Sequence, residues 1–184
     1  MRVLDITIVG SWMKISILGM VLLIFSASVQ AGDWEHAPNF SDFPAGMSFR
    51  GKPAPVRIES RAARKFRSVL REGAKNGPDF AGHYTVVVWG CGADSFSLAV
   101  VDARNGKVYF PPFGCITLAG GHDALTIGAK EVDNPAYLKN SNLLIFAGAE
   151  DTPSLDPKDR AIQFWLFQDG HFRLVYSIPA PRQE

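Results

Sequence analysis

The stretch FAGHYTVVVWGCG, residues 80–92, places a histidine and a cysteine close together in the sequence. A cysteine acts as a nucleophile when a neighbouring base or a positive field keeps it as the thiolate. Cys91 could pair in this way with His83, or with His122 oriented by Asp123. The apolar run between His83 and Cys91 predicts a strand, which would separate the two residues by about 26 Å if fully extended. That pair therefore requires a bend in the chain.

A second possible chemistry is hydrolysis by a histidine and a carboxylate acting as acid and base. The candidates are His83 or His122 with Asp94 or Asp123. No serine lies in a G-x-S-x-G nucleophile motif, and the histidines lack a metal-ligand spacing such as H-E-x-x-H. We therefore expect no metal and no other cofactor. We assign no catalytic residue and keep His83, His122 and Asp123 as candidates.

The first 31 residues have the pattern of a secretory signal peptide. Lys14 precedes the apolar run ISILGMVLLIF, and small residues at positions 29 and 31 predict cleavage after Ala31. The run is shorter than the roughly 20 residues of a membrane span. Translation begins at Met1 or, alternatively, at Met13. We expect a periplasmic or secreted protein with no membrane span after cleavage.

Cleavage after Ala31 would remove 31 of the 184 residues and leave 153, enough for one domain with a substantial core. It would also remove two of the 19 basic residues and one of the 18 acidic residues, leaving 17 of each. A mature chain without net charge does not indicate a nucleic-acid partner. Residues 32–55, rich in proline and glycine, predict an extended arm, and residues 56–184 predict a single β-rich domain.

Only two cysteines are present, Cys91 and Cys115. An even number of cysteines in an exported protein favours a disulfide. The alternative is two free thiols.

Residues 61–75, RAARKFRSVLREGAK, predict an amphipathic helix that Ser60 caps. Its apolar residues fall on one face, and six cations cover the rest against a single acid, Glu72. Such a surface can dock on an acidic partner, lipid headgroups or an anionic cell-wall polymer. The alternative is an ordinary solvated face. The candidate binding residues are Arg64, Arg67 and Arg71 on this helix, with His122 and Asp123 in the glycine-rich loop.

The remaining pattern changes to a period of two and predicts strands. Two similar units follow one another, each with an apolar strand, a loop and a hairpin turned by Asn105-Gly106 or Asp169-Gly170. We predict an α+β, mainly β fold of two antiparallel three-stranded meanders with one N-terminal basic helix. The meanders would form a sandwich or a partial propeller-like arrangement.

The segments FAGHYTVVVWGCG, VVDARNGKVYF, SNLLIFAG and FWLFQDGHFRLVYS together resemble a family of uncharacterised exported bacterial proteins with a FAGHYT-x-x-x-WGCG core motif. Members of the family often carry a second cysteine soon after this motif, where this chain has Ala93-Asp94-Ser95. The departure leaves Cys115 as the partner of Cys91. The resemblance implies export and a single fold, and it implies no mechanism.

The sequence therefore favours a small exported β-rich protein that binds without catalysis, such as an envelope binding or inhibitor-type protein. Its partner would be an anionic envelope component or a protein. The alternative is an envelope hydrolase that uses histidine and aspartate near the glycine-rich loop. Tyr84–Trp89 would be a core strand, with His83 at its entrance holding a neighbouring backbone group.

Overall fold

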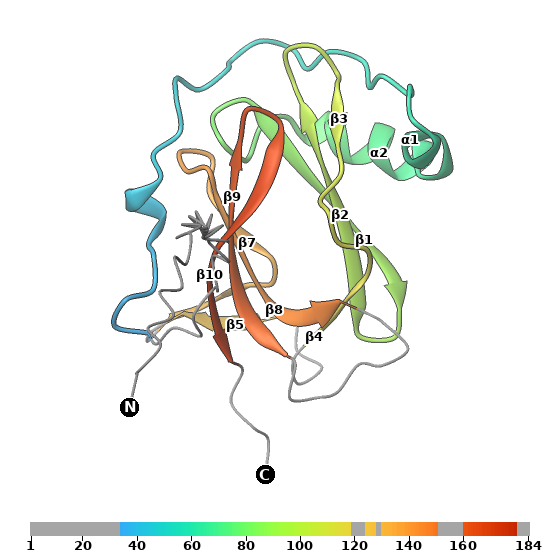
Figure 1. Cartoon of the computed structure of the whole chain (residues 1–184). Coiled ribbons are helices and arrows are strands. Elements are labelled where there is room, and N and C mark those ends of the chain that lie inside the picture. The colour runs from blue at the N-terminus through green and yellow to red at the C-terminus, as the bar shows by residue number, and fades with distance from the viewer. Residues whose placement is uncertain (1–33, 119–123, 128–129, 151–159, 180–184) are drawn as a thin grey trace, which may run out of the picture.

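The computed structural model describes residues 34–118, 124–127, 130–150 and 160–179. They form a mainly β structure with few helices, so the predicted fold class is confirmed (Figure 1). The predicted signal peptide and its cleavage point lie outside the described residues. No helix in the described ranges combines the length and apolar character needed to cross a membrane.

The helical elements are η1 (Phe40–Asp42), α1 (Arg61–Lys65), α2 (Arg67–Gly73) and η2 (Ala74–Asn76). The longer strands are β1 (Tyr84–Gly92), β2 (Ser95–Asp102), β8 (Leu143–Glu150), β9 (Ala161–Gln168) and β10 (His171–Pro179). The shorter strands are β3 (Val108–Tyr109), β4 (Ile116–Leu118), β5 (Ala124–Ile127), β6 (Lys130–Asp133) and β7 (Ala136–Tyr137).

Both predicted meanders are present, but they belong to a single sheet of eight strands in the order β1-β2-β4-β8-β9-β10. Strand β3 pairs with β2 and β7 with β8, while β5 and β6 form a separate hairpin. The short strand β4 joins the meanders, because Ile116 pairs with both Phe96 of β2 and Glu150 of β8. The sequence analysis did not predict β4, since three residues are too few for a periodic signal.

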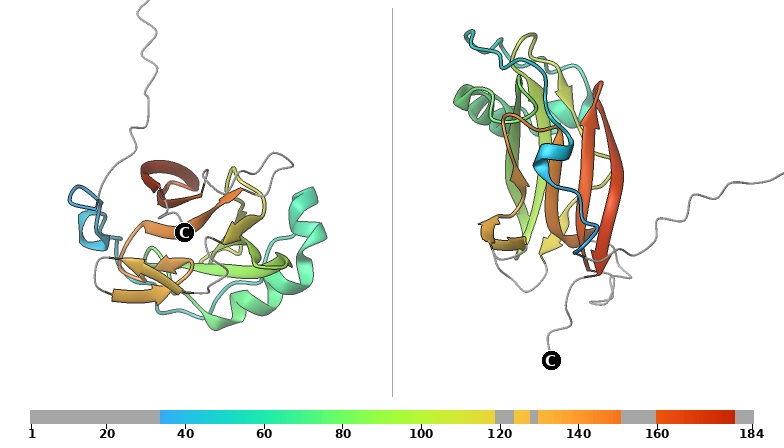
Figure 2. Two further views of the ribbon diagram at one scale, coloured as in Figure 1. Left: turned by 90° about the horizontal axis from the view of Figure 1, so that it is seen from below. Right: turned by 90° about the vertical axis from the view of Figure 1, so that its left-hand side faces the viewer.

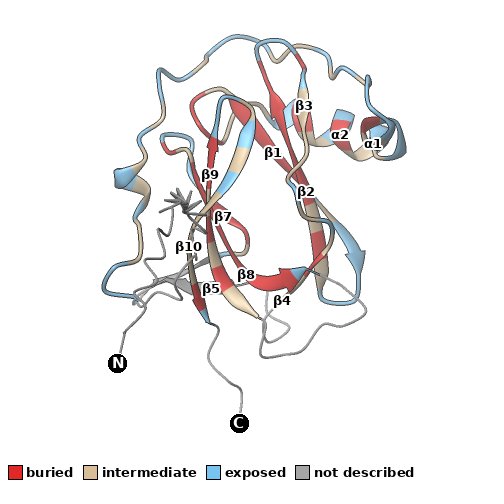
Figure 3. Cartoon of the chain, in the orientation of Figure 1, coloured by how far each residue is buried: buried red, intermediate tan, exposed pale blue. Residues whose placement is uncertain are grey.

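The sheet folds back so that the two meanders face each other as layers, with the helices outside the first layer (Figure 2). Buried stretches of both layers stand out in Figure 3, and the core cluster between the layers is rich in aromatic residues. Its fully or nearly fully buried members include Phe80, Tyr84, Leu98, Phe146 and Phe167. A second cluster lies between the helices and the outer face of β1 and β2, and a third on the outer face of β8 and β9.

The predicted basic helix forms but is interrupted at Phe66. The Ser60 hydroxyl accepts a hydrogen bond from the Ala63 amide at 2.9 Å, as expected for the N-cap. Phe66 leaves helical geometry at φ −105° and ψ 19°, which separates α1 from α2. Its ring packs on Trp89 of β1, with 4.6 Å between ring centroids. Buried Leu70 and half-buried Gly73 complete the apolar face, and Gly73 lies so close to Val87 that a side chain there would collide with it.

The two predicted hairpins form, but their turns differ. Asp169 and Gly170 both have positive φ, 52° and 78°, as a two-residue type I′ turn requires. The turn after β2 is longer, because the Asp102 amide donates to the Lys107 carbonyl at 2.9 Å across a four-residue loop. Only Gly106 has positive φ in that loop, so the prediction of two equal turns was wrong in this detail.

The N-terminal arm follows the surface of the described domain from the second layer to the helices (Figure 1). Phe40 and Phe43 pack against the cluster on the outer face of β8 and β9. Further along the arm, the Ala54 amide donates to the Ala103 carbonyl and the Arg57 amide to the Gly106 carbonyl, each at 2.8 Å. The arm therefore holds the β2–β3 turn in place.

Candidate functional site

The strongest surface feature is the cationic face of the helices, which we call the basic face. Its members are Arg61, Arg64, Lys65, Arg67, Arg71 and Lys75, all exposed. The face arises directly from the helical period, because the apolar residues that alternate with these cations pack onto β1 and β2. The predicted binding residues Arg64, Arg67 and Arg71 therefore lie on one surface.

Local interactions neutralise little of this charge. Lys75 pairs with Glu72, with 2.6 Å between Nζ and Oε2. Arg64 donates to the Glu59 carbonyl at 2.9 Å, and Arg67 donates to the Arg64 carbonyl at 3.4 Å. Carbonyl groups carry no net charge, so these bonds orient the guanidinium groups without cancelling them. Within the described part of the chain, Lys75 is the one cation of the basic face with a carboxylate partner.

The predicted histidine–carboxylate sites are not brought together among the described residues. Asp94 is exposed in the turn between β1 and β2, where its carbonyl accepts a hydrogen bond from the Leu118 amide at 2.8 Å. His83 lies at the opposite end of β1. His122 and Asp123 lie outside the described residues.

His83 instead faces Asp102, which sequence analysis missed. Nε2 of His83 lies 3.9 Å from Oδ2 of Asp102, beyond hydrogen-bond distance, and this buried nitrogen has no hydrogen-bond partner in the part of the chain that the structure describes. His83 does hold a neighbouring backbone group, but through its carbonyl and not its ring: the carbonyl accepts a hydrogen bond from the Ala103 amide at 2.9 Å.

The Asp102 carboxylate is bound by residues of the β2–β3 turn that follows it. It accepts hydrogen bonds from the Arg104 amide at 2.9 Å, from the Arg104 guanidinium at 3.1 and 3.2 Å, and from the Asn105 side chain at 3.0 Å. Aspartate at the start of a turn commonly binds the backbone two residues on, so the segment DARNG carried a signal for this arrangement. Asp102 therefore organises the β2–β3 turn and is not free to orient the His83 ring.

The charge states of the pair follow from these contacts. Burial, and then the nearby Arg104 guanidinium, lower the pKa of His83, and Asp102 offsets this only in part. Burial acts most strongly and raises the pKa of Asp102, but the hydrogen bonds and charge of Arg104, together with His83, outweigh it and hold that pKa below its usual value. Near neutral pH, His83 is therefore neutral and Asp102 ionised.

This neutral histidine makes the stability of the protein dependent on pH. Because its pKa in the folded state lies below the ordinary 6.5, the unfolded chain binds more protons than the folded chain as the pH falls below about 6.5. We expect His83→Gln to flatten the loss of stability between about pH 7 and pH 5. Urea unfolding midpoints across this range measure the effect, with exposed His171→Gln as the control. Equal slopes for wild type and His83→Gln would contradict it.

The predicted disulfide is confirmed. Cys91 and Cys115 are bonded, with 6.3 Å between their Cα atoms. Cys91 is the extra residue of a β-bulge, because Gly90 pairs with Phe96 and Gly92 with Ser95. The bond ties the end of β1 to the residue before β4. Neither cysteine is a thiol, so the Cys–His nucleophile is excluded.

No three histidine, cysteine, aspartate or glutamate side chains gather into a possible metal site within the described ranges. Comparison with family models, curated proteins and solved structures found no match to this chain. The basic face is therefore the candidate site that the structure itself defines.

Proposed function

We propose that this protein is an exported, non-catalytic binding protein that docks on an anionic component of the cell envelope through Arg64, Arg67 and Arg71. One observation carries the proposal. The apolar side of the helices packs on β1 and β2, whereas the cations on the other side are exposed and largely lack carboxylate partners among the described residues. Clustered cations of this kind attract polyanions over a Debye length.

The surrounding structure supports binding over catalysis and an oxidising compartment over the cytosol. Cys91 and Cys115 form a disulfide, as is common in exported proteins. The apolar run before Ala31 fits export by a signal peptide. Asp102 already holds the β2–β3 turn, and no described residue pair favours the hydrolase alternative.

Charge reversal on the basic face tests the proposal. We expect Arg64→Glu/Arg67→Glu/Arg71→Glu to weaken co-sedimentation of the mature protein with isolated bacterial envelopes by at least about a hundredfold, since each of the three lost cations contributes ~1 kcal/mol at an anionic surface and each glutamate is repelled by it. Binding of the wild type should fall steeply with added salt.

The control variant is Arg50→Glu/Lys139→Glu/Arg173→Glu, which changes the net charge equally at exposed positions on the arm, the β7–β8 loop and β10. It should bind nearly as the wild type does. If both triple variants lose binding to the same extent, net charge and not the basic face governs association. If the basic-face variant binds normally, the proposed function is wrong.

A further inference from the structure

Strand β1 is an edge of the sheet, and only its first half is covered. The Tyr84 amide and carbonyl, which point away from β2, bond with Phe80 at 2.9 Å in both directions. The outward amide of Val86 donates to the Asp79 carboxylate at 2.9 Å. The segment before β1 thus folds back and satisfies the edge as far as the Val86 amide.

The second half of this edge is open with respect to the described residues. In an antiparallel pair, residues alternate between those that bond across the pair and those that point outward. The β1–β2 register is regular from Tyr84 to Gly90, so Val88 and Gly90 point their amide and carbonyl groups outward, as Tyr84 and Val86 do. No described residue bonds to these groups of Val88 and Gly90. The bulge at Cys91 ends the open stretch.

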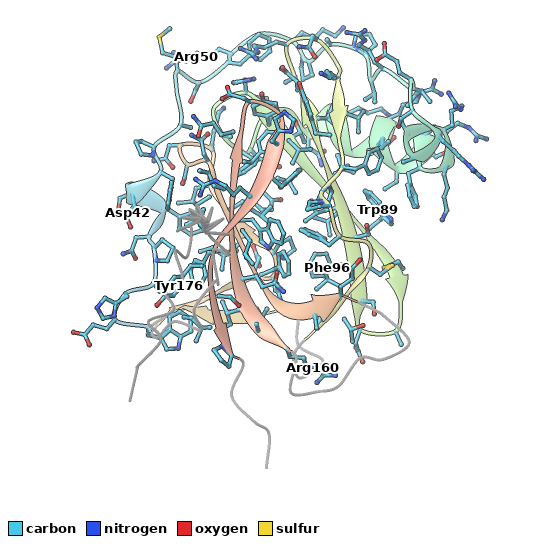
Figure 4. All side chains as sticks on the ribbon, viewed as in Figure 1. Asp42, Arg50, Trp89, Phe96, Arg160 and Tyr176 are labelled. Atoms are coloured by element: carbon cyan, nitrogen blue, oxygen red, sulfur yellow. A yellow bond between two sulfur atoms is a disulfide. The ribbon has the colours of Figure 1, made fainter. Side chains whose placement is uncertain are left out.

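The side chains beside the open edge also indicate that a partner could bind there. Val88 lies on the same side of the strand as core residue Val86, yet it is 38% exposed. Trp89, labelled in Figure 4, lies on the helix side, and its buried indole N–H has no hydrogen-bond partner among the described residues. Trp89 stacks on Phe66, and the ammonium of Lys65 lies 5.0 Å from the centre of the Phe66 ring. The open edge therefore carries outward backbone groups and an exposed apolar side chain, and through Trp89 and Phe66 it adjoins Lys65 of the basic face.

We propose that the open edge of β1 at Val88 and Gly90 receives an extended acidic segment of a partner protein as an added strand. This deepens the proposed function by naming its partner class, and it rests on that function because the same basic face supplies the attraction. Backbone hydrogen bonds to Val88 and Gly90 align the segment. Alternate side chains point to opposite faces of the sheet, so its acidic residues lie toward the helices and its others against Val88.

The charges distinguish this partner from a second copy of the chain. Two copies paired antiparallel through β1 would form one continuous sheet, with both basic faces on the same side of it. The exposed cations of the two copies would then repel across the junction, whereas carboxylates on an incoming strand would be attracted. The structure therefore favours an acidic partner over a homodimer.

Amide hydrogen exchange tests the inference at the edge itself. The probe is a capped peptide of about nine residues in which glutamate alternates with threonine, within the usual length of a strand. We expect saturating peptide to slow exchange of the Val88 and Gly90 amides by at least about tenfold, corresponding to ~1.4 kcal/mol. A peptide with lysine in place of glutamate, and an acidic peptide N-methylated at alternate residues, should give no such protection.

Two variants at one position distinguish the contribution of the Val88 backbone amide to peptide binding from that of its side chain. Val88→Pro removes the outward amide without removing a bond to β2, and it should weaken peptide binding by at least about tenfold. Val88→Ala keeps the amide and loses only side-chain contact, so it should weaken peptide binding clearly less than Val88→Pro does. If Val88→Pro does not fold, the N-methylated peptide still tests the same hydrogen bonds.

The outcomes also separate this inference from the proposed function. No protection at Val88 and Gly90 by the glutamate peptide would overturn the strand-addition model, as would equal protection by the N-methylated peptide. Protection that appears without peptide, together with a concentration-dependent dimer in sedimentation, would assign the edge to a second copy. If Val88→Pro retains envelope binding while the basic-face variant loses it, the proposed function stands and the acidic strand is overturned.

Discussion

Replacing Phe167 by alanine is expected to lower the free energy of unfolding by about 3–5 kcal/mol, the usual cost of truncating a buried phenylalanine. Phe167 of β9 is 1% exposed. Its ring centroid lies 5.8 Å from that of Phe80, 4.9 Å from Tyr84, 5.6 Å from Tyr109 and 4.7 Å from Phe172. The side chain therefore joins the two layers, and its removal leaves a cavity that neighbours on both layers would have to fill.

Urea unfolding at neutral pH measures this loss. The control is Phe172→Ala on β10, because Phe172 touches the same ring but is only half-buried. We expect the control to lose clearly less stability, since less apolar area leaves water at that position. Equal losses for the two variants would show that Phe167 does not hold the layers together.

Removing the disulfide is expected to cost about 3–4 kcal/mol, on the chain-entropy estimate for the loop that it closes. Cys91 and Cys115 are 24 residues apart, and this segment includes all of β2 and β3. The bond anchors the residue before β4, and β4 joins the two meanders. Its loss should therefore loosen the junction between the layers as well as the two segments that the bond connects, the end of β1 and the residue before β4.

Cys91→Ser/Cys115→Ser compared with the wild type, each in the presence and absence of a reductant, measures the effect through urea midpoints. Reduction should bring the wild type close to the double variant, while the double variant should not respond to the reductant. An unchanged midpoint after either treatment would contradict the prediction. Amide exchange in β4 should rise in the variant if the bond secures the junction.

Local chemistry was sufficient to predict several elements from the sequence. Ser60 caps a helix because its hydroxyl needs only the amide three residues later. Asp169-Gly170 predicts a tight hairpin because these residue types accept positive φ. The continuous apolar run from Tyr84 predicts a buried strand, and the even cysteine count predicts the disulfide. Each signal involves neighbours in sequence or a single possible pairing.

The candidate site was predictable only in part. The cations of the basic face follow from helical spacing, so the sequence indicated them. The interruption at Phe66 did not follow, because it depends on Trp89, a residue on another element. Asp102 was missed because its importance arises from the turn that folds around it. The open edge at Val88 was also not predictable, because the sequence does not show on which side of a strand a neighbouring strand is missing.

The sequence by itself determined the class of fold, the basic helical face, the main hairpins and the pairing of the two cysteines. Each of these depends on period, turn chemistry or composition within short segments. Only the tertiary structure decided that β4 merges two meanders into one sheet and that β1 presents an open edge beside the basic face. These features depend on which distant segments pair as strands. The local sequence favours several such pairings equally, and burial and loop closure select among them.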